Sequence, residues 1–344
     1  MIKLFKSAVL LSVIFGFVAC NEEPAGSYDT KRSITVMFYN VENLFDIINN
    51  QGERDIEFTP GSEKKWDSER YQKKLDDISK VISSVSTIEL PEIIGLCEIE
   101  NRSVLDDLVK TTVLHDGNYE IAHFESPDYR GIDCALLFRP DEFSVISKSP
   151  VHVSFPDNPE YSTRDILYVK GKTLNNEEFH IFVNHWPSRI GGLEETEIKR
   201  VAVAGILKSK TDSVLQQNPE ANILIMGDMN DEPSNKSLSE VLGAKNPETG
   251  DAPLVNLMFP QHVEKKGSYN YRGNWNMLDN IVISGGLLDN TGFRCTERKG
   301  YVFSEPWMEY KAENGTVSPN RTYGGPNYYG GVSDHFPVFA KFSR

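Results

Sequence analysis

Short runs of β-branched and aromatic residues recur along the chain, and most of them end at a polar residue. Runs of this composition are typical of strands. Their apolar residues are nearly continuous rather than alternating, which favours strands that are covered on both faces. The runs lie at 34–39, 93–97, 135–138, 166–169, 179–183, 223–226, 280–283 and 338–342.

Two helices are expected between these strands. Apolar residues recur at intervals of three and four, the spacing of one helix face, and Pro91 ends this pattern. They are Tyr71, Leu75, Ile78, Ile82 and Val85. A second helix is expected from about 194 to 216, and Asn175-Asn176 is a hairpin signal. Strands that outnumber helices indicate two packed sheets with helices outside.

The N-terminus reads as an export signal. Lys3 and Lys6 precede an apolar run at 8–18, which is shorter than a permanent membrane span. The run ends in Ala19-Cys20, which resembles a bacterial lipoprotein cleavage site. We therefore expect a signal peptide at 1–19, then a lipidated Cys20 and a polar tether at 20–30. The alternative is an ordinary cleaved signal with an incidental cysteine.

The remaining residues, 31–344, are expected to form one domain, because they contain no linker-like change of composition and no repeat. The net charge of −14 argues against a protein that coats long stretches of nucleic acid, since that mode depends on Lys and Arg. It does not argue against a hydrolase that acts on one phosphate. The cysteines Cys97, Cys134 and Cys295 are expected to be small buried residues.

Polar residues that can do chemistry follow or precede the predicted strands directly. Carboxylates gathered in one cleft would repel one another unless a cation compensated them. Their hard oxygen atoms suit Mg²⁺ or Mn²⁺, with Ca²⁺ a further option, rather than zinc. The polar residues at strand ends are Glu98, Asn184-His185, Asp228, Asn230, Asp279 and Ser333-Asp334-His335.

Six blocks in order along the chain resemble the signature blocks of the endonuclease/exonuclease/phosphatase (DNase I-like) superfamily. The blocks are Phe38-Tyr-Asn40-Val-Glu42-Asn43-Leu-Phe, Gly95-Leu-Cys-Glu98-Ile-Glu-Asn101, Asn184-His185-Trp-Pro, Gly227-Asp228-Met-Asn230-Asp231-Glu232-Pro233, Leu278-Asp279-Asn-Ile-Val-Ile-Ser284 and Ser333-Asp334-His335-Phe-Pro-Val338. The resemblance implies a four-layer α/β/β/α sandwich of two mixed, mainly antiparallel sheets. It also implies a divalent-metal-dependent hydrolase of phosphate esters.

The resemblance assigns metal ligands. Glu98 resembles the principal ligand, Glu42 and Asp334 resemble further ligands, and Asn40 would orient metal and phosphate. A cation there would polarise the phosphoryl oxygens. For Glu42 the alternative is a solvated carboxylate near the site.

The resemblance also assigns catalytic residues. Asp228 resembles the group that positions or deprotonates the attacking water, and Asn230 would donate to a phosphate oxygen. His335, oriented by Asp279, and His185 would flank the phosphate. Whether His335 acts as a base or as an electrostatic clamp stays open.

Four further residues are expected to bind substrate or support the site. Asp133 replaces the Glu that assists the counterpart of His185 in the nuclease branch, and Arg130 or Arg164 would grip the phosphate in bidentate fashion. For Asp133 and Arg130 the alternative is a loop salt bridge. Asn184, next to His185, is grouped with these substrate-binding residues.

The favoured substrate is nucleic acid, cleaved at its phosphodiester bonds. The alternatives are a small-molecule phosphatase, of the inositol phosphate type, a sphingomyelinase-like phosphodiesterase and a non-catalytic binding relic of the fold. The aromatic segment 301–329 would either stack unpaired bases or pack a long loop. We expect a monomer without a protein partner, exported and anchored in the membrane as a periplasmic or cell-surface bacterial lipoprotein.

The position of Cys20 gives the first prediction. The Cys20→Ala chain should be released from the membrane, because the lipid would be attached to that sulfur atom. Fractionation of cells that express each form measures this. Recovery of the unmodified wild-type chain in the soluble fraction would contradict it.

Overall fold

The computed structural model describes residues 33–50, 54–86, 88–249, 252–288 and 292–344, which belong to one compact unit. The predicted signal peptide, Cys20 and the tether at 20–30 lie outside the described residues, so those expectations stay predictions. In the described part of the chain, no helix combines the length and the apolar character that a membrane crossing needs.

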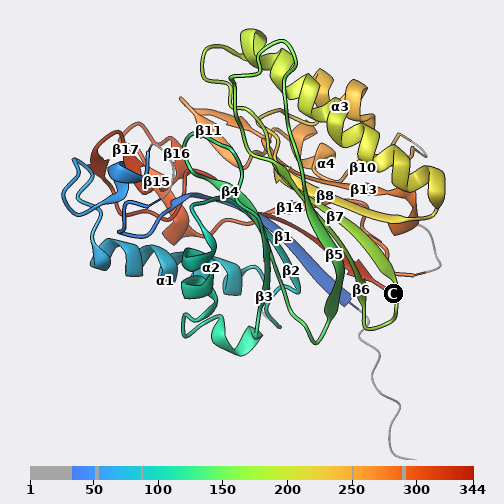
Figure 1. Ribbon diagram of the computed structural model, residues 1–344, viewed down its shortest axis with the longest axis horizontal. Coiled ribbons are helices and arrows are strands. Elements are labelled where there is room, and N and C mark those ends of the chain that lie inside the picture. The colour runs from blue at the N-terminus through green and yellow to red at the C-terminus, as the bar shows by residue number, and fades with distance from the viewer. Residues whose placement is uncertain (1–32, 51–53, 87, 250–251, 289–291) are drawn as a thin grey trace, which may run out of the picture. The chain divides into compact units, whose positions relative to one another are not determined.

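Two large sheets carry the fold (Figure 1). The first contains β1 (Ser33–Leu44), β2 (Ile93–Ile99), β3 (Glu120–His123), β4 (Asp133–Phe138), β14 (Tyr301–Val302) and β19 (Val338–Ser343). The second contains β5 (Phe143–Val151), β6 (Ile166–Thr173), β7 (Glu178–His185), β8 (Asn222–Asp228), β9 (Ala244–Lys245), β10 (Leu254–Asn256) and β13 (Asp279–Ser284). Their orders are β14-β19-β1-β2-β4-β3 and β5-β6-β7-β8-β13-β10-β9.

Helices and small hairpins complete the structure. The helices are α1 (Ser68–Ser84), α2 (Arg102–Val109), α3 (Leu193–Gln217) and α4 (Phe259–Val263). Short helical turns lie at Asp55–Phe58, His115–Gly117, Ser237–Leu242, Gly285–Leu287 and Pro306–Met308. The hairpins pair β11 (Tyr269–Tyr271) with β12 (Asn274–Asn276), β15 (Glu309–Lys311) with β16 (Val317–Pro319), and β17 (Tyr323–Gly324) with β18 (Asn327–Tyr328).

Three buried clusters hold the layers together, and they explain why the strands are apolar on both faces. Val36 and Phe38 of β1 pack between the two sheets, whereas Met37 and Tyr39 contact the cluster that includes α1 and α2. A third cluster joins the second sheet to α3. The predicted four-layer α/β/β/α sandwich is therefore confirmed, and Figure 1 shows α1 and α2 on one side and α3 on the other.

The sheets are mixed and mainly antiparallel, as predicted. In the described residues the pairs β1–β2, β7–β8 and β9–β10 are parallel, and the other pairs are antiparallel. Each predicted strand and both predicted helices are present with small shifts of their ends. The hairpin expected at Asn175-Asn176 joins β6 to β7, and Asn176 has a φ of 60°. Cys97, Cys134 and Cys295 are buried free thiols, as expected.

Gly227 allows β8 to pass close to β7. A Cβ atom at this position would touch the backbone oxygen of Asn184 and would lie 2.6 Å from the Asn184 Cβ atom. Neither atom can move without displacing the strand, so the pairing that precedes Asp228 depends on this glycine.

Gly227→Ala should therefore lower the free energy of unfolding by about 1–3 kcal/mol, the usual cost of overpacking. Gly205→Ala is the matched control, because Gly205 lies in α3 with open space around its Cα atom. That change should raise the free energy of unfolding by about 0.5–1 kcal/mol. Denaturant titration measures both, and equal midpoints for Gly227→Ala and wild type would contradict the close approach.

Candidate active site

The predicted catalytic side chains gather at the edge where strands of both sheets end. The strands β7 and β8 run parallel, and His185 at the end of one pairs with Asp228 at the end of the other. Asp279 begins the antiparallel β13 and also pairs with Asp228. Asn40 of the first sheet donates from Nδ2 to Asp228 Oδ2 across 3.1 Å. Asp228 therefore joins the polar ends of the two sheets.

The backbone is locally strained at this edge. Four residues here other than glycine have positive φ angles: Glu42 at 52°, Asn43 at 57°, Glu98 at 62° and Asn230 at 49°. Register shifts interrupt the β1–β2 pairing after Asn40 and the β2–β4 pairing around Glu98. Such conformations and bulges persist where surrounding structure imposes them, and they are concentrated at functional sites. They give these side chains directions that a regular strand would not allow.

Asp228, His335 and Asp279 form the centre of the site. His335 Nδ1 lies 2.7 Å from Asp279 Oδ2, and His335 Nε2 lies 3.8 Å from Asp228 Oδ2. Burial would lower the pKa of His335, but Asp279 and Asp228 outweigh it and hold that pKa well above its ordinary value. Burial, with repulsion from Asp279, raises the pKa of Asp228 to about 7. The pair therefore combines a cationic imidazole with a carboxylate that can exchange a proton near neutral pH.

His185 differs from His335 in its charge state. Its Nε2 lies 3.7 Å from Asp228 Oδ2 and 3.9 Å from Glu98 Oε1, which are longer than hydrogen bonds. Burial and the nearby Arg164 and Arg130 hold the pKa of His185 well below its ordinary value. The neutral imidazole is thus placed between the two carboxylates, and within the described residues its Nδ1 atom has no hydrogen-bond partner.

Glu98 is an ionised carboxylate that the local chain holds in place. Its Oε2 accepts from the backbone N–H of Asn43 at 3.0 Å and lies 3.2 Å from Arg130 Nη2. Burial would raise the pKa of Glu98, but Arg130 and His335 outweigh it and hold that pKa below its ordinary value. Arg130 also donates to Asn43 Oδ1 at 2.7 Å. Arg130 therefore pairs with Glu98, and its expected grip on the phosphate stays a prediction.

The donor set fits a hard divalent cation. Glu98 Oε1 lies 3.9 Å from His185 Nε2, beyond hydrogen-bond distance. Among the described residues, the contacts of the Asp334 carboxylate are 3.7 Å to Arg321 Nη2 and 4.0 Å to His335 Nε2. Carboxylate oxygens are the ligands that Mg²⁺ and Mn²⁺ prefer, and those without a short hydrogen bond can accept a cation. Asp228, Asp279 and His335 also place one atom each within 4.8 Å of one another. Because His335 already bonds Asp279, we assign that group to proton and charge chemistry.

Glu42 is held by the backbone of a neighbouring loop, and its place among the metal ligands stays a prediction. Both of its carboxylate oxygens accept backbone N–H groups, from Thr322 at 2.7 Å and from Tyr323 at 3.2 Å. Burial and the nearby Asp334 raise the pKa of Glu42 to about 8. The positive φ of Glu42 turns the side chain toward the loop before β17. Glu42 therefore fixes the loop at 322–323 beside the site.

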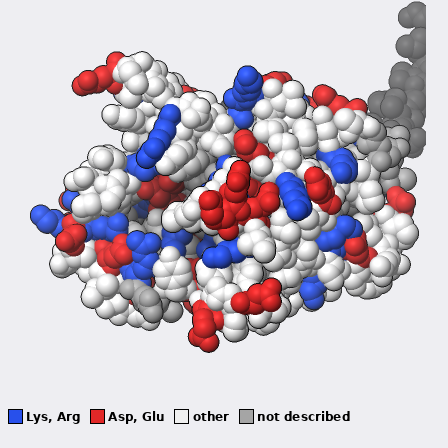
Figure 2. Space-filling model, turned by 90° about the horizontal axis from the view of Figure 1, so that it is seen from above, with Lys and Arg blue, Asp and Glu red and all other residues white. Residues whose placement is uncertain are grey.

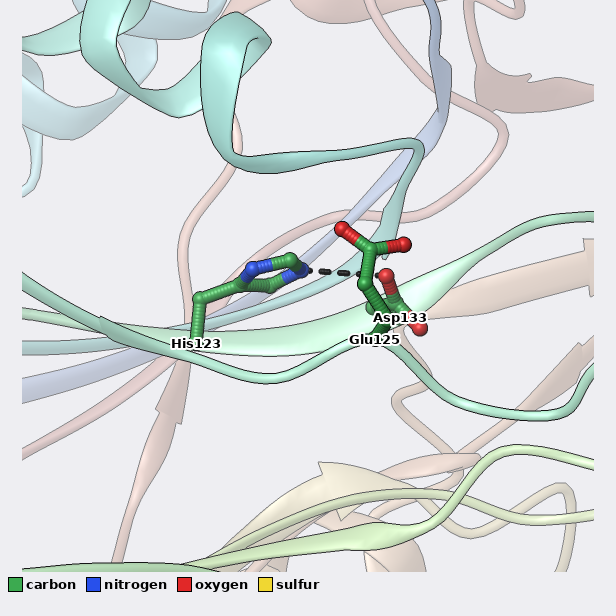
Figure 3. A group of neighbouring side chains, drawn as sticks. All are labelled: His123, Glu125 and Asp133. Carbon is green, nitrogen blue, oxygen red and sulfur yellow. Dashed lines mark hydrogen bonds and ion pairs between the residues drawn. The ribbon is translucent and has the colours of Figure 1, made fainter. Parts of the chain in front are cut away.

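Asp133 is likewise directed elsewhere (Figure 3). Its Oδ2 lies 3.0 Å from His123 Nε2, and its Oδ1 accepts from the backbone N–H of Ser126 at 2.6 Å. Figure 3 shows the Glu125 carboxylate beside this pair. The expectation that Asp133 supports His185 is wrong, because Asp133 starts β4 on the β3 side and contacts His123 instead.

Arg164 and Asn184 serve the backbone rather than the cleft. Arg164 donates to the carbonyl oxygens of His185 at 3.2 Å and Trp186 at 2.7 Å, and to Asp128 Oδ2 at 3.1 Å. Asn184 is fully buried, with its amide on two strand carbonyls and its oxygen accepting from the Trp186 indole at 3.1 Å. Both residues hold the turn that carries His185, which corrects their expected place among substrate-binding residues.

Asn230 contributes to the same turn. Its backbone N–H donates to Asp228 Oδ1 at 2.9 Å, and its side-chain Nδ2 donates to Trp186 O at 3.0 Å. The first contact fixes the orientation of the Asp228 carboxylate. The second leaves one amide hydrogen of Asn230 for another acceptor.

Two basic residues at the site were not found from sequence. Lys74 of α1 is buried and donates to Thr322 Oγ1 at 2.6 Å and to Val332 O. Burial lowers the pKa of Lys74 to about 8, against the attraction of Glu42 and Asp334. Arg321 lies on the rim beside Asp334. Neither residue belongs to a signature block. Lys74 lies in the amphipathic helix α1, where a lysine is usually exposed to solvent.

The surface around the site is hollow and charged. Figure 2 shows a hollow on the side toward which β1 runs in Figure 1, with acidic side chains inside it and Lys and Arg along its border. The aromatic segment 301–329 forms part of the structure beside it. Tyr323 is buried among Phe58 and Trp66, whereas Tyr310 and Tyr329 are exposed. The segment is therefore partly packed and partly open to solvent.

Comparisons with known proteins agree with this fold. The family model described as "Endonuclease/Exonuclease/phosphatase family" matches residues 35–344. No curated protein matches the chain.

Solved structures share the fold. An endonuclease/exonuclease/phosphatase family protein from Bacteroides thetaiotaomicron is 18% identical, with a TM-score of 0.56, and the match covers 90% of this chain and 94% of that one. A mannosyl-6-phosphatase from the same organism is 17% identical with a TM-score of 0.56, covering 90% and 100%. TDP2 from D. rerio, complexed with single-strand DNA product, is 12% identical with a TM-score of 0.54, covering 91% and 99%.

The position of Glu98 predicts that cation binding stabilises the fold. At a Mg²⁺ or Mn²⁺ concentration about 100 times the Kd, the free energy of unfolding should rise by about 2.7 kcal/mol. Glu98→Gln should remove most of this gain, whereas Glu220→Gln, at an exposed position, should keep it. Thermal unfolding with and without the cation measures the effect. An equal rise in Tm for Glu98→Gln and wild type would exclude Glu98 as a ligand.

Proposed function

The chain belongs to the endonuclease/exonuclease/phosphatase family, and from that premise we propose that it hydrolyses phosphate esters with a divalent cation, with a phosphodiester bond of nucleic acid as the favoured target. Members of this family are phosphoester hydrolases, so the coarse reaction follows from membership. The observation that carries the proposal is the position of Asp228. It lies within 3.8 Å of both His335 Nε2 and His185 Nε2, beside the ionised Glu98.

Three side chains have different roles at the phosphate that is hydrolysed. His335, kept cationic by Asp279, stabilises negative charge that builds up on the phosphoryl oxygens. Asp228 aligns the attacking water and accepts its proton, which suits a carboxylate whose pKa is about 7. His185 is neutral, so it can donate one hydrogen bond without adding charge.

Other residues bind the cation and hold the geometry. Glu98 and Asp334, with Asn40 beside them, would hold a divalent cation that polarises the phosphoryl oxygens. Asn40 fixes Asp228 by its 3.1 Å hydrogen bond. Arg130 keeps Glu98 ionised and places further donors next to the phosphate. The free amide hydrogen of Asn230 can donate to a phosphate oxygen.

A second candidate is a phosphatase that acts on a small phosphate ester. The charge of the chain favours it, because a net charge of −14 opposes the binding of a long polyanion. The fold is also shared with a mannosyl-6-phosphatase. Hydrolysis of linear duplex DNA, single-stranded DNA, RNA, sphingomyelin and sugar or inositol phosphates, each with Mg²⁺ or Mn²⁺, distinguishes the candidates.

We also propose that the protein is exported and anchored by lipid on Cys20. The apolar run at 8–18, the Lys residues before it and the Ala19-Cys20 pair support this. An anchored enzyme would act on substrates outside the cytoplasm.

Loss of Asp228 or His335 should reduce turnover far more than substrate binding. Asp228→Asn and His335→Ala should each lower kcat by about 10²- to 10⁴-fold, the usual contribution of acid–base assistance. The double variant should lose less than the product of the two effects, because the groups act in one step. Steady-state kinetics with excess Mg²⁺ or Mn²⁺ measures this, and EDTA should abolish activity.

The matched controls are Asp116→Asn and His115→Ala, since both side chains are largely exposed away from the site. They should keep wild-type kinetics. A folded Asp228→Asn or His335→Ala chain that retains more than about a tenth of wild-type kcat/KM would show that the assigned role is wrong. Full turnover in EDTA would refute metal dependence.

A further inference from the structure

A small cavity of about 70 Å³ lies beside Glu98, the candidate metal ligand. Its lining includes Asn43, Arg54, Glu57, Phe58, Lys64 and Arg130. Arg130 and Asn43 also hold Glu98, whereas the proposed reaction gives no role to Arg54, Glu57, Phe58 or Lys64. That part of the cavity is therefore a feature that the proposed reaction does not explain.

The cavity adjoins the catalytic centre through two of its lining residues. Asn43 donates its backbone N–H to Glu98 Oε2 at 3.0 Å, and Arg130 Nη2 lies 3.2 Å from the same oxygen. Arg130 Nη2 also donates to Asn43 Oδ1. One wall of the cavity is thus the structure that holds Glu98, so a group in the cavity would lie next to the phosphate at the metal.

The lining is positively charged, in contrast to the chain as a whole. It contains three cations, Arg54, Lys64 and Arg130, and one carboxylate, Glu57. The Glu57 carboxylate pairs with two of these cations: its Oε1 lies 2.8 Å from Arg54 Nε, and its Oε2 lies 3.7 Å from Lys64 Nζ. Since the chain carries a net charge of −14, this concentration of basic groups favours an anion at this place.

The Lys64 ammonium group is positioned before any ligand binds. Lys64 Nζ lies 5.2 Å from the centre of the Phe58 ring and 5.0 Å from that of Tyr323. The Phe58 ring is buried and stacks on Phe45 at 4.3 Å. Aromatic faces hold an ammonium group over them by electrostatic attraction. A preorganised cation binds an anion with less loss of side-chain entropy.

The volume matches one small anionic group. A single water needs about 10–15 Å³ measured in the same way, so 70 Å³ accommodates several waters or one phosphate group. A wider hollow of about 720 Å³ continues outward and shares Arg54, Glu57 and Lys64 with the cavity. It adds Ile56 and Pro326 to its walls. The remainder of a larger substrate therefore has room beyond the cavity.

We propose that this cavity binds a second phosphate group of the substrate, so that the preferred substrate carries one phosphate beyond the one that is hydrolysed. This rests on the proposed function. The second phosphate can come from the neighbouring nucleotide of a strand or from a small molecule with two phosphates. Both sources present the same chemistry to Arg54, Lys64 and Arg130.

Paired substrates test the proposal and separate the two sources. The nucleotide pair is thymidylyl-thymidine with and without a 5′-phosphate, and the small-molecule pair is a hexose bisphosphate and its monophosphate. The wild-type kcat/KM should be roughly tenfold or more higher for the member with two phosphates, since a charge-assisted hydrogen bond contributes on that scale. If the preference appears in one of the two pairs and not in the other, that pair identifies the source of the second phosphate. Lys64→Met and Arg54→Gln should each reduce the ratio of kcat/KM between the two members of the preferred pair toward one.

Lys210→Met, which removes an exposed lysine of α3, is the matched control for charge and should keep the ratio. Calorimetry gives a readout without turnover: with Mg²⁺ in excess, wild type should bind pyrophosphate more tightly than orthophosphate, and Lys64→Met should lose this difference. Equal binding of the two anions, or a ratio unchanged by both variants, would overturn the inference. An enzyme with no turnover of any phosphate ester would refute the proposed function. Calorimetry would still show whether the cavity binds a second phosphate group.

Discussion

The active edge depends on the compensation of buried carboxylates. Asp228, Asp279 and Glu98 are 2%, 0% and 8% exposed, and a buried charge without a partner costs several kcal/mol. His335 lies between the two aspartates, and Arg130 accompanies Glu98. The partners that make burial tolerable also set the charge states that the proposed chemistry requires. Stability and reactivity at this edge therefore have one electrostatic cause.

The two sheets give that arrangement its rigidity. Apolar strands that are covered on both faces cannot shift by one residue without exposing their side chains to the wrong layer. Gly227 lets β8 approach β7, so the ends of these strands deliver His185 and Asp228 side by side. The positive φ angles of Glu98 and Asn230 then turn the chain at the point where each strand stops. Rigid strands followed by sharp turns position the polar groups closely.

Several polar residues near the site hold this frame. Asn184 and Arg164 satisfy carbonyl groups behind His185, and Glu42 accepts two backbone N–H groups of the 322–323 loop. Lys74 binds the same loop from α1. The contacts of Asn184, Arg164 and Glu42 satisfy buried backbone groups that would otherwise be costly. The loops around the cleft are therefore tied to the sandwich by side chains distant in sequence.

The sequence by itself determined the strands, two helices, the sandwich and the residues around Asp228, because apolar runs and strand-end motifs are local patterns. It did not determine where Glu42, Asp133, Asn184 and Arg164 point. Those directions depend on positive φ angles and bulges, and on partners 280 residues away in the case of Glu42 and Thr322. The cavity between the Asn43 and Lys64 segments also arose only from tertiary packing. A local pattern records which residues are near a strand end, whereas the folded chain decides which neighbours each side chain meets.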